Sequence, residues 1–190
     1  MSTEIVVMQV FNGVSLFTIL LLMSIGLAIV FGLMGVINMA HGELMALGAY
    51  VTYLTAGAFS HYAPQWMDVY LFVAIPVAFV ATSAFGWLLE RGFVRHFYNR
   101  PLDTLLATWG LILIFQQTYR SVVGPQEVSV PLPAWLSGAW EPFVGIQLPL
   151  NRLFIIGLTA VVTVGVFLLL TRTRWGLRVR AVTQNRPMSA

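Results

Sequence analysis

The stretch that decides the fold is IVVMQVFNGVSLFTILLLMSIGLAIVFGLMGVINMAHG, residues 5–42, which contains no acidic residue and no arginine. A helix needs about 20 apolar residues to cross a hydrocarbon core of roughly 30 Å. The run is therefore too long for one straight span and too short for two. It predicts a spanning helix at about Val7–Leu33, then a break in the region of Asn38–Glu43, then a second helix.

The composition of the whole chain agrees with a membrane protein. Hydrophobic residues make up 58% and charged residues only 9%, whereas a soluble domain carries about 25% charged residues. The ten basic residues are all arginine and the net charge is +3, but most of them flank apolar stretches, as juxtamembrane charges do. We therefore expect a lipid environment and no nucleic-acid partner. The absence of cysteine excludes disulfides and thiolate metal sites.

Further apolar runs predict four more spans. They lie at about Leu44–Phe59, Val69–Leu89, Pro101–Tyr119 and Leu153–Thr171. Five prolines and three glycines within residues 120–152 rule out a continuous helix there. The predicted fold class is all-α: a polytopic transmembrane bundle of about five spans, with a broken or re-entrant segment near Asn38–Glu43.

The distribution of arginines predicts the orientation. Eight of the ten lie within residues 91–100 and 172–186. Two spans separate these places, so both lie on one side of the membrane, and the positive-inside rule makes that side cytoplasmic. The proline-rich residues 120–152 are then outside. The amino terminus lacks the positive region of a signal peptide, so the first helix is expected to be retained in the mature protein.

The polar residues Asn38, His41 and Glu43 lie between two apolar helices. An ionisable side chain at membrane depth costs several kcal/mol unless it is paired or wetted. Broken helices are tolerated where they line protein or a water-filled cavity, so these residues are candidates for a substrate pathway. The alternative is an ordinary interfacial turn with Glu43 in water, and the sequence leaves both open.

Two other groups of residues have two interpretations each. Thr108 could line a polar path or make an interhelical hydrogen bond. The carboxyl-terminal residues could dock on another protein or on anionic headgroups, or could serve only as a positive-inside flank. The docking candidates are Arg178, Arg180, Gln184, Asn185 and Arg186.

The sequence contains no motif of an enzyme. It lacks a Gly-x-x-x-x-Gly-Lys phosphate loop and a His-Glu-x-x-His pair. His41, His61 and His96 are scattered among different segments. We therefore expect no catalytic residue, no metal site and no cofactor in this chain.

Several segments resemble a known transporter family. GLMGVINMAHGE at 32–43 resembles the amino-terminal signature of the permeases of branched-chain amino-acid ABC importers. WGLRVRAVTQNR at 175–186 resembles the segment that leads into their ATPase-contacting loop. RPLDTLLATWG at 100–110, with Leu148-Pro149 and Arg152–Ile155, resembles the urea-transporting branch in particular.

The resemblance implies a set of partners: a second, related permease, two ATP-binding subunits and a periplasmic solute-binding protein. It places Asn38, His41 and Glu43 in a functional break, and it places the carboxyl-terminal residues at the ATPase. It also implies a multi-pass protein of the bacterial cytoplasmic (inner) membrane. ATP hydrolysis is then expected in the partner subunits. Family members continue for about another hundred residues, so residues 1–190 are expected to be a single permease domain that is cut short at its carboxyl end.

The resemblance to the urea-transporting branch implies urea or a short-chain amide as the solute. The small number of charges in the spans agrees with this, because urea is neutral and needs no countercharge. One alternative is a branched-chain amino acid, which is zwitterionic and usually requires charged or helix-end partners. An alternative of another class is a passive urea channel or an ion-coupled carrier, in which Glu43 and His41 would form a proton relay.

Overall fold

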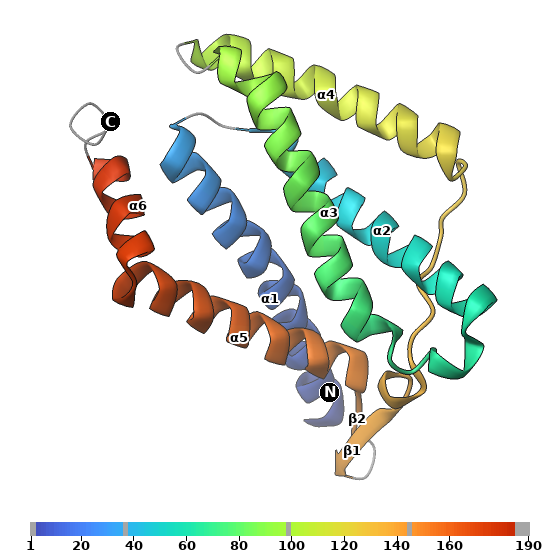
Figure 1. The fold of residues 1–190 in the computed structure, drawn as a ribbon. Helices are drawn as coiled ribbons and strands as arrows, with labels where there is room; N and C mark the ends of the chain where they lie inside the picture. The colour runs from blue at the N-terminus through green and yellow to red at the C-terminus, as the bar shows by residue number, and fades with distance from the viewer. Residues whose placement is uncertain (1–2, 36–37, 98–99, 144–145, 185–190) are drawn as a thin grey trace. The chain divides into compact units, whose positions relative to one another are not determined.

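The computed structural model describes residues 3–35, 38–97, 100–143 and 146–184. Helices dominate it (Figure 1), as the apolar runs predict. The helices are α1 (Thr3–Met34), α2 (His41–Tyr62), α3 (Tyr70–Gly92), α4 (Pro101–Val122), α5 (Leu150–Arg172) and α6 (Arg174–Gln184). Short 3-10 turns lie at Pro64–Trp66, Val94–Phe97 and Ala134–Leu136, and a hairpin is formed by β1 (Ala139–Phe143) and β2 (Ile146–Pro149).

The predicted helical class is confirmed, and the five predicted spans correspond to α1–α5. Three of these are long and apolar enough to cross a membrane: Ile5–Gly32, Tyr70–Gly92 and Leu150–Arg172. The other two, α2 and α4, have 22 residues each, about 33 Å at 1.5 Å per residue. They carry more polar side chains than the other three, and some of these, such as Glu43, Thr108 and Gln116, form the site described below.

The three apolar helices are exposed over most of their surface. Only 6 to 11% of the residues in their most apolar windows are buried within the chain. A helix that is apolar all round is stable only when lipid or other protein covers it. Burial for these helices must therefore come from the membrane and from neighbouring polypeptide.

The chain divides into two compact units, one made of residues 1–35 and 134–190 and the other of residues 36–133. The second unit is built on α2 and α3, which pack along each other. A Cβ added at Gly48 would lie 3.5 Å from Thr82 Oγ1, and one added at Gly86 would lie 3.9 Å from Leu44 Cδ1. Because the partner numbers fall on α3 as they rise on α2, the two helices are antiparallel, with small residues between them.

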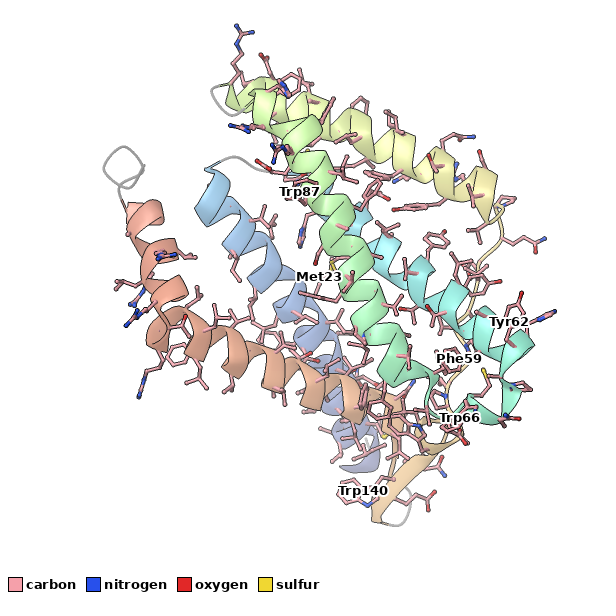
Figure 2. The ribbon with its side chains drawn as sticks, viewed as in Figure 1. Met23, Phe59, Tyr62, Trp66, Trp87 and Trp140 are labelled. Atoms are coloured by element: carbon pink, nitrogen blue, oxygen red, sulfur yellow. The ribbon has the colours of Figure 1, made fainter. Side chains whose placement is uncertain are left out.

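Aromatic side chains lie near both ends of α3. Tyr62 and Trp66 are strongly exposed at the connection that precedes α3 (Figure 2). Near the other end, Trp87 is also exposed, and the Arg91 guanidinium lies 5.5 Å from the centre of its ring. Aromatic belts with arginine on the cytoplasmic side are typical of the two membrane interfaces. The pattern fits α3 as a full span with its carboxyl end at the predicted cytoplasmic side.

The first unit contains α1, α5, α6 and the hairpin. Residue Ala139 pairs with Pro149 and Trp140 with Leu148, and the register is irregular between Trp140 and Phe143. The proline-rich composition of residues 120–152 predicts a loop, and it does not predict this hairpin. Two prolines, 142 and 149, cannot donate backbone hydrogen bonds, which keeps the strands short.

Candidate functional site

The predicted helix break lies between α1 and α2, but it is shorter than the sequence suggested. Gly35 follows α1 with a φ of 68°, a conformation that favours glycine, and α2 begins at His41 rather than at the predicted Leu44. His41 and Glu43 therefore belong to the first turn of a helix. The amide of Ala40 donates a 3.0 Å hydrogen bond to Asn38 Oδ1, and such a local turn leads the chain into α2.

Thr108 of α4 holds the residue next to Asn38. The backbone amide of Met39 donates to Thr108 Oγ1 at 3.3 Å, and the Thr108 hydroxyl donates to the Leu105 carbonyl at 3.1 Å. The Thr108 side chain is completely buried. Its hydroxyl therefore satisfies a backbone donor that the non-helical segment leaves without a helical partner. This is the interhelical bond that the sequence left open as one of two interpretations.

Glu43 is held by the second half of α4. Gln116 Nε2 donates to Glu43 Oε1 at 3.2 Å, and the Tyr119 hydroxyl donates to the Glu43 carbonyl oxygen at 2.9 Å. The Tyr119 ring stacks on Tyr50 of α2 with 4.6 Å between centroids. No ion pair includes Glu43 among the described residues. Its carboxylate is thus held by a neutral amide donor rather than by a cation.

An apolar cluster lies beside these polar contacts. Ala40, Leu111 and Phe115 are buried together, with Phe85 of α3 packed against them. The rings of Phe85 and Phe115 lie 5.5 Å apart, nearly edge to face. The first turn of α2 therefore packs against both α3 and α4. It makes polar contacts with Gln116 and Tyr119 and apolar contacts with this cluster.

Two neighbours give the depth of this turn. Leu44 lies opposite Gly86, six residues before the end of α3 at Gly92, which is about 9 Å along the helix. Met39 is bonded to Thr108, seven residues after the start of α4, which is about 10 Å. The arginine-bearing connection between α3 and α4 marks the predicted cytoplasmic side. Both neighbours therefore place the start of α2 well inside the ends of α3 and α4.

The structure thus brings Asn38, Glu43 and Thr108 to one contact between α2 and α4, with His41 half-buried in the same turn. The contacts of Tyr119 and Tyr50 were not predicted from the sequence. The signal for Tyr119 was available. Thr108, Phe115 and Tyr119 recur at intervals of seven and four residues, which places them on one face of a helix.

The carboxyl-terminal segment forms α6, set off from α5 by a sharp corner at Thr173. The Thr173 hydroxyl donates to the Leu169 carbonyl at 2.5 Å and accepts from the Gly176 amide at 3.1 Å. A Cβ at Gly176 would lie 2.3 Å from the carbonyl oxygen of Leu170 and 2.4 Å from that of Leu169. The corner therefore needs glycine at this position.

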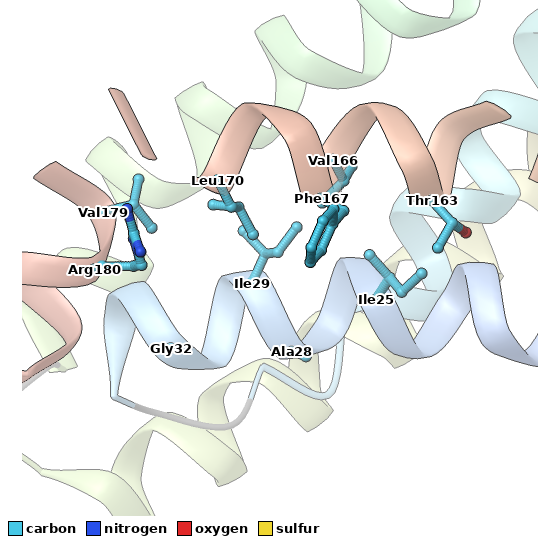
Figure 3. Close-up of a pocket in the computed structure, with 10 residues that line it drawn as sticks. All are labelled: Ile25, Ala28, Ile29, Gly32, Thr163, Val166, Phe167, Leu170, Val179 and Arg180. Carbon is cyan, nitrogen blue, oxygen red and sulfur yellow. The ribbon is translucent and has the colours of Figure 1, made fainter. Parts of the chain in front are cut away.

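Three of the five predicted ATPase-contacting residues lie in the part of the chain that the structure describes. Arg178 and Arg180 lie on α6 with exposed side chains, and Gln184 is its last residue. Asn185 and Arg186 lie outside the described residues. A mostly apolar groove of about 410 Å³ runs between α1 and α5 and is closed at one end by Val179 and Arg180 of α6 (Figure 3). The groove therefore lies where the basic helix α6 meets α1 and α5.

Long apolar helices, together with a polar helix break that is bonded to α4, define a multi-pass helical membrane protein. Residues 9–190 match the family described as the permease component of branched-chain amino acid transport systems. The chain belongs to this family, and the predicted resemblance is confirmed at that level. Family membership and the apolar helices also confirm the predicted localisation as a multi-pass protein of the bacterial inner membrane.

Curated relatives carry the same description in their names. The high-affinity branched-chain amino acid transport system permease protein LivH of Escherichia coli strain K12 is 32% identical over 133 residues, which are 70% of this chain and 42% of that protein. LivH of Salmonella typhimurium is 31% identical over the same length. The permease protein BraD of Pseudomonas aeruginosa is 26% identical over 184 residues, which are 95% of this chain and 60% of BraD.

The chain spans 42 to 60% of the length of these relatives. No solved structure matches it significantly. The relatives named here are branched-chain amino-acid permeases, so the finer assignment to a urea-transporting branch is not supported by them.

Proposed function

We propose that this chain is a permease subunit of an ABC importer that moves a branched-chain amino acid into the cytoplasm. Family membership supports the class of protein, and the names of the relatives support the solute. The structural observation that carries the proposal is the start of α2, where Glu43 and the Met39 amide are bonded to α4 inside the bundle. Interrupted helices of this kind line solute paths in transporters.

In this proposal Asn38, His41 and Glu43 form the part of the pathway that this chain contributes, and Thr108 positions it. The Glu43 carboxylate can accept hydrogen bonds from an ammonium or an amide group, while Gln116 offers both a donor and an acceptor. A solute that enters here would exchange the Gln116–Glu43 bond for bonds of its own. Because one helix supplies the acceptor and the other the donor, the exchange would loosen α2 from α4.

The proposed partners are a second permease, two ATP-binding subunits and a periplasmic solute-binding protein. The exposed apolar surfaces of α1, α3 and α5 provide area for a second membrane subunit and for lipid. The basic helix α6, which carries Arg178 and Arg180 on exposed positions, is the proposed contact for an ATP-binding subunit. ATP would be hydrolysed in those subunits and not in this one.

Urea is a second candidate solute, on two observations. The segment RPLDTLLATWG at 100–110 resembles the urea branch of the family. In addition, the Glu43 carboxylate is bonded to the Gln116 amide and the Glu43 carbonyl oxygen to the Tyr119 hydroxyl. Within the described residues no ion pair brings to Glu43 a cation that could receive the carboxylate of a solute. A neutral solute such as urea needs hydrogen-bond donors and acceptors only, and this contact provides both.

One experiment separates the candidates. Radiolabelled leucine and radiolabelled urea are offered to cells that express the whole importer, with either an active ATPase or one inactivated in its phosphate loop. ATPase-dependent leucine uptake that excess urea does not reduce establishes the amino-acid importer. ATPase-dependent urea uptake that leucine does not reduce assigns the importer to urea. Flux that continues with the inactive ATPase contradicts an ABC importer and favours a channel or an ion-coupled carrier.

A further inference from the structure

The chain that follows α4 runs back along α2. Gly124, with a φ of 107°, turns the chain out of the helix, and residues 124–131 then continue as an extended segment, here called the strap (Figure 1). The Tyr70 hydroxyl donates to the Pro131 carbonyl at 2.5 Å, and Val130 packs against the buried cluster of Ala56, Tyr70 and Ala74. The strap is therefore held at its carboxyl end by a hydrogen bond and by packing, and its amino end continues directly from α4.

A cavity of about 500 Å³ lies between the strap and α2. Its floor is one face of α2, formed by Ala46, Ala49, Tyr50 and Tyr53, which recur at helical spacing. Its walls are the strap and Arg120 from the last turn of α4. The volume falls in the range of about 300–1,000 Å³ that small-molecule sites occupy. The strap and Arg120 belong to residues 120–152, which the arginine distribution predicts to be outside.

Two opposite charges line this cavity. Arg120 and Glu127 are both exposed, and within the described residues neither side chain has a hydrogen-bond or ion-pair partner. The two alanines of the floor contribute a small apolar surface, and the two tyrosines contribute flat aromatic rings with hydroxyl groups. A cation, an anion and an apolar face in one small cavity are the complement of a molecule that carries a carboxylate, an ammonium and an aliphatic side chain.

The cavity also adjoins the helix break. Tyr50 lines it and stacks on Tyr119 at 4.6 Å, and Tyr119 donates to the Glu43 carbonyl. A ligand that contacts Tyr50 would therefore be linked to the first turn of α2 through the stacked rings of Tyr50 and Tyr119 and the hydrogen bond of Tyr119 to Glu43. This continuity gives the cavity the position of an outer vestibule on the path to Glu43.

We propose that this cavity binds the zwitterion of an aliphatic α-amino acid before it passes the helix break. Arg120 receives the carboxylate, Glu127 receives the ammonium, and Ala46 and Ala49 contact the aliphatic side chain. The proposal rests on the amino-acid importer proposed above and adds to it the residues that recognise the solute on the outer side.

The test is direct binding of radiolabelled leucine to the purified whole importer in lipid nanodiscs, with the solute-binding protein left out. Arg120→Gln and Glu127→Gln should each weaken leucine binding about tenfold or more, because each removes a charge-assisted bond. Arg120→Lys and Glu127→Asp keep the charges and should retain most of the affinity. Glu141→Gln removes a carboxylate that is bonded to Gln147 outside the cavity, and it should leave binding unchanged.

Analogues of leucine test which charge of the ligand each residue binds. The ratio of two affinities measured on one preparation does not depend on the amount of protein obtained. Leucinamide lacks the carboxylate, and 4-methylpentanoate lacks the ammonium. The unaltered importer should prefer leucine to both. The Arg120→Gln importer should no longer bind leucine more tightly than leucinamide. The Glu127→Gln importer should no longer bind leucine more tightly than 4-methylpentanoate.

Leucine uptake by the same variants, measured with ATP and the solute-binding protein, separates the two proposals. If the importer transports leucine but neither neutralisation alters leucine binding or analogue preference, the vestibule proposal is wrong and the importer proposal stands. If it transports urea and no leucine, both proposals are wrong. Undetectable leucine binding to an importer that transports leucine also overturns the vestibule.

Discussion

The carbonyl oxygen of Glu43 accepts a hydrogen bond of 2.9 Å from the hydroxyl of Tyr119, a residue 76 positions further along the chain. The bond joins the first turn of α2 to the second half of α4. A carbonyl oxygen has two lone pairs, so this bond can exist beside the bond that the α2 backbone makes. It therefore holds α2 without disturbing the helix that α2 forms.

Removal of the Tyr119 hydroxyl tests whether this bond matters for transport. Tyr119→Phe keeps the ring that stacks on Tyr50 and loses only the donor. We expect a loss of about 1 kcal/mol of stability and a reduction of several-fold in uptake, measured in cells with equal amounts of membrane-inserted importer. Tyr62→Phe, at the exposed carboxyl end of α2 and outside the cavity, is the matched control. Unchanged uptake by Tyr119→Phe would show that the bond is not part of the transport cycle.

Glu43→Gln tests the carboxylate itself. The substitution keeps size and hydrogen-bonding capacity but removes the charge, so the helix can remain bonded to Gln116 after rotation of one amide. We expect normal membrane insertion and strongly reduced uptake, because an ammonium or amide donor would meet a neutral acceptor. Insertion is measured by quantitative immunoblot of membranes, and uptake with radiolabelled solute. Glu141→Gln serves as the control, and equal uptake by both variants would contradict a role for the Glu43 charge.

Thr108→Val tests whether the buried threonine positions the helix break. Valine has nearly the same shape but cannot accept the bond from the Met39 amide, which would then be left unsatisfied at a cost of about 1–3 kcal/mol. We expect a lower unfolding temperature of the purified protein together with reduced uptake. Thr108→Ser restores the hydroxyl and should recover most of both. If valine loses uptake with no change in unfolding temperature, Thr108 lines the path instead.

Much of this architecture follows from the sequence. The number of long helices and the place of the break are set by the lengths of the apolar runs, and these depend on bilayer thickness. The start of α2 could not be placed, because His41 and Glu43 are polar and are stabilised as helix by contacts from α4 that no local pattern reports. Tertiary contacts override local composition at such positions.

The partners of Glu43 show the same limit. Spacings of seven and four residues place Thr108, Phe115 and Tyr119 on one face of α4. The spacings do not say which other helix this face contacts. The hairpin of β1 and β2 was missed for a different reason. Its strands are short and contain prolines, so they lack the alternation by which a strand is recognised.

The orientation is tested by reporter fusions. A reporter joined after His96, between α3 and α4, should report a cytoplasmic location, and one joined after Ser137, before the hairpin, should report a periplasmic one. The reason is that Arg91, Arg95 and Arg100 lie at the first place, where the positive-inside rule applies. Alkaline phosphatase and green fluorescent protein fusions give opposite readouts. The reverse pattern would move the proposed vestibule to the cytoplasmic side.

The corner between α5 and α6 provides the last prediction. Gly176 lies so close to the carbonyl oxygens of Leu169 and Leu170 that a methyl group cannot fit without a shift of the backbone. Gly176→Ala should therefore change the direction of α6 and with it the placement of Arg178 and Arg180. We expect loss of ATP-binding subunits in co-purification while the permease itself still inserts. Gly165→Ala, at a site in α5 with open space around the added carbon, should retain them. Equal recovery of the ATP-binding subunits with both variants would mean that α6 does not hold them, and that its arginines serve only to orient the chain in the membrane.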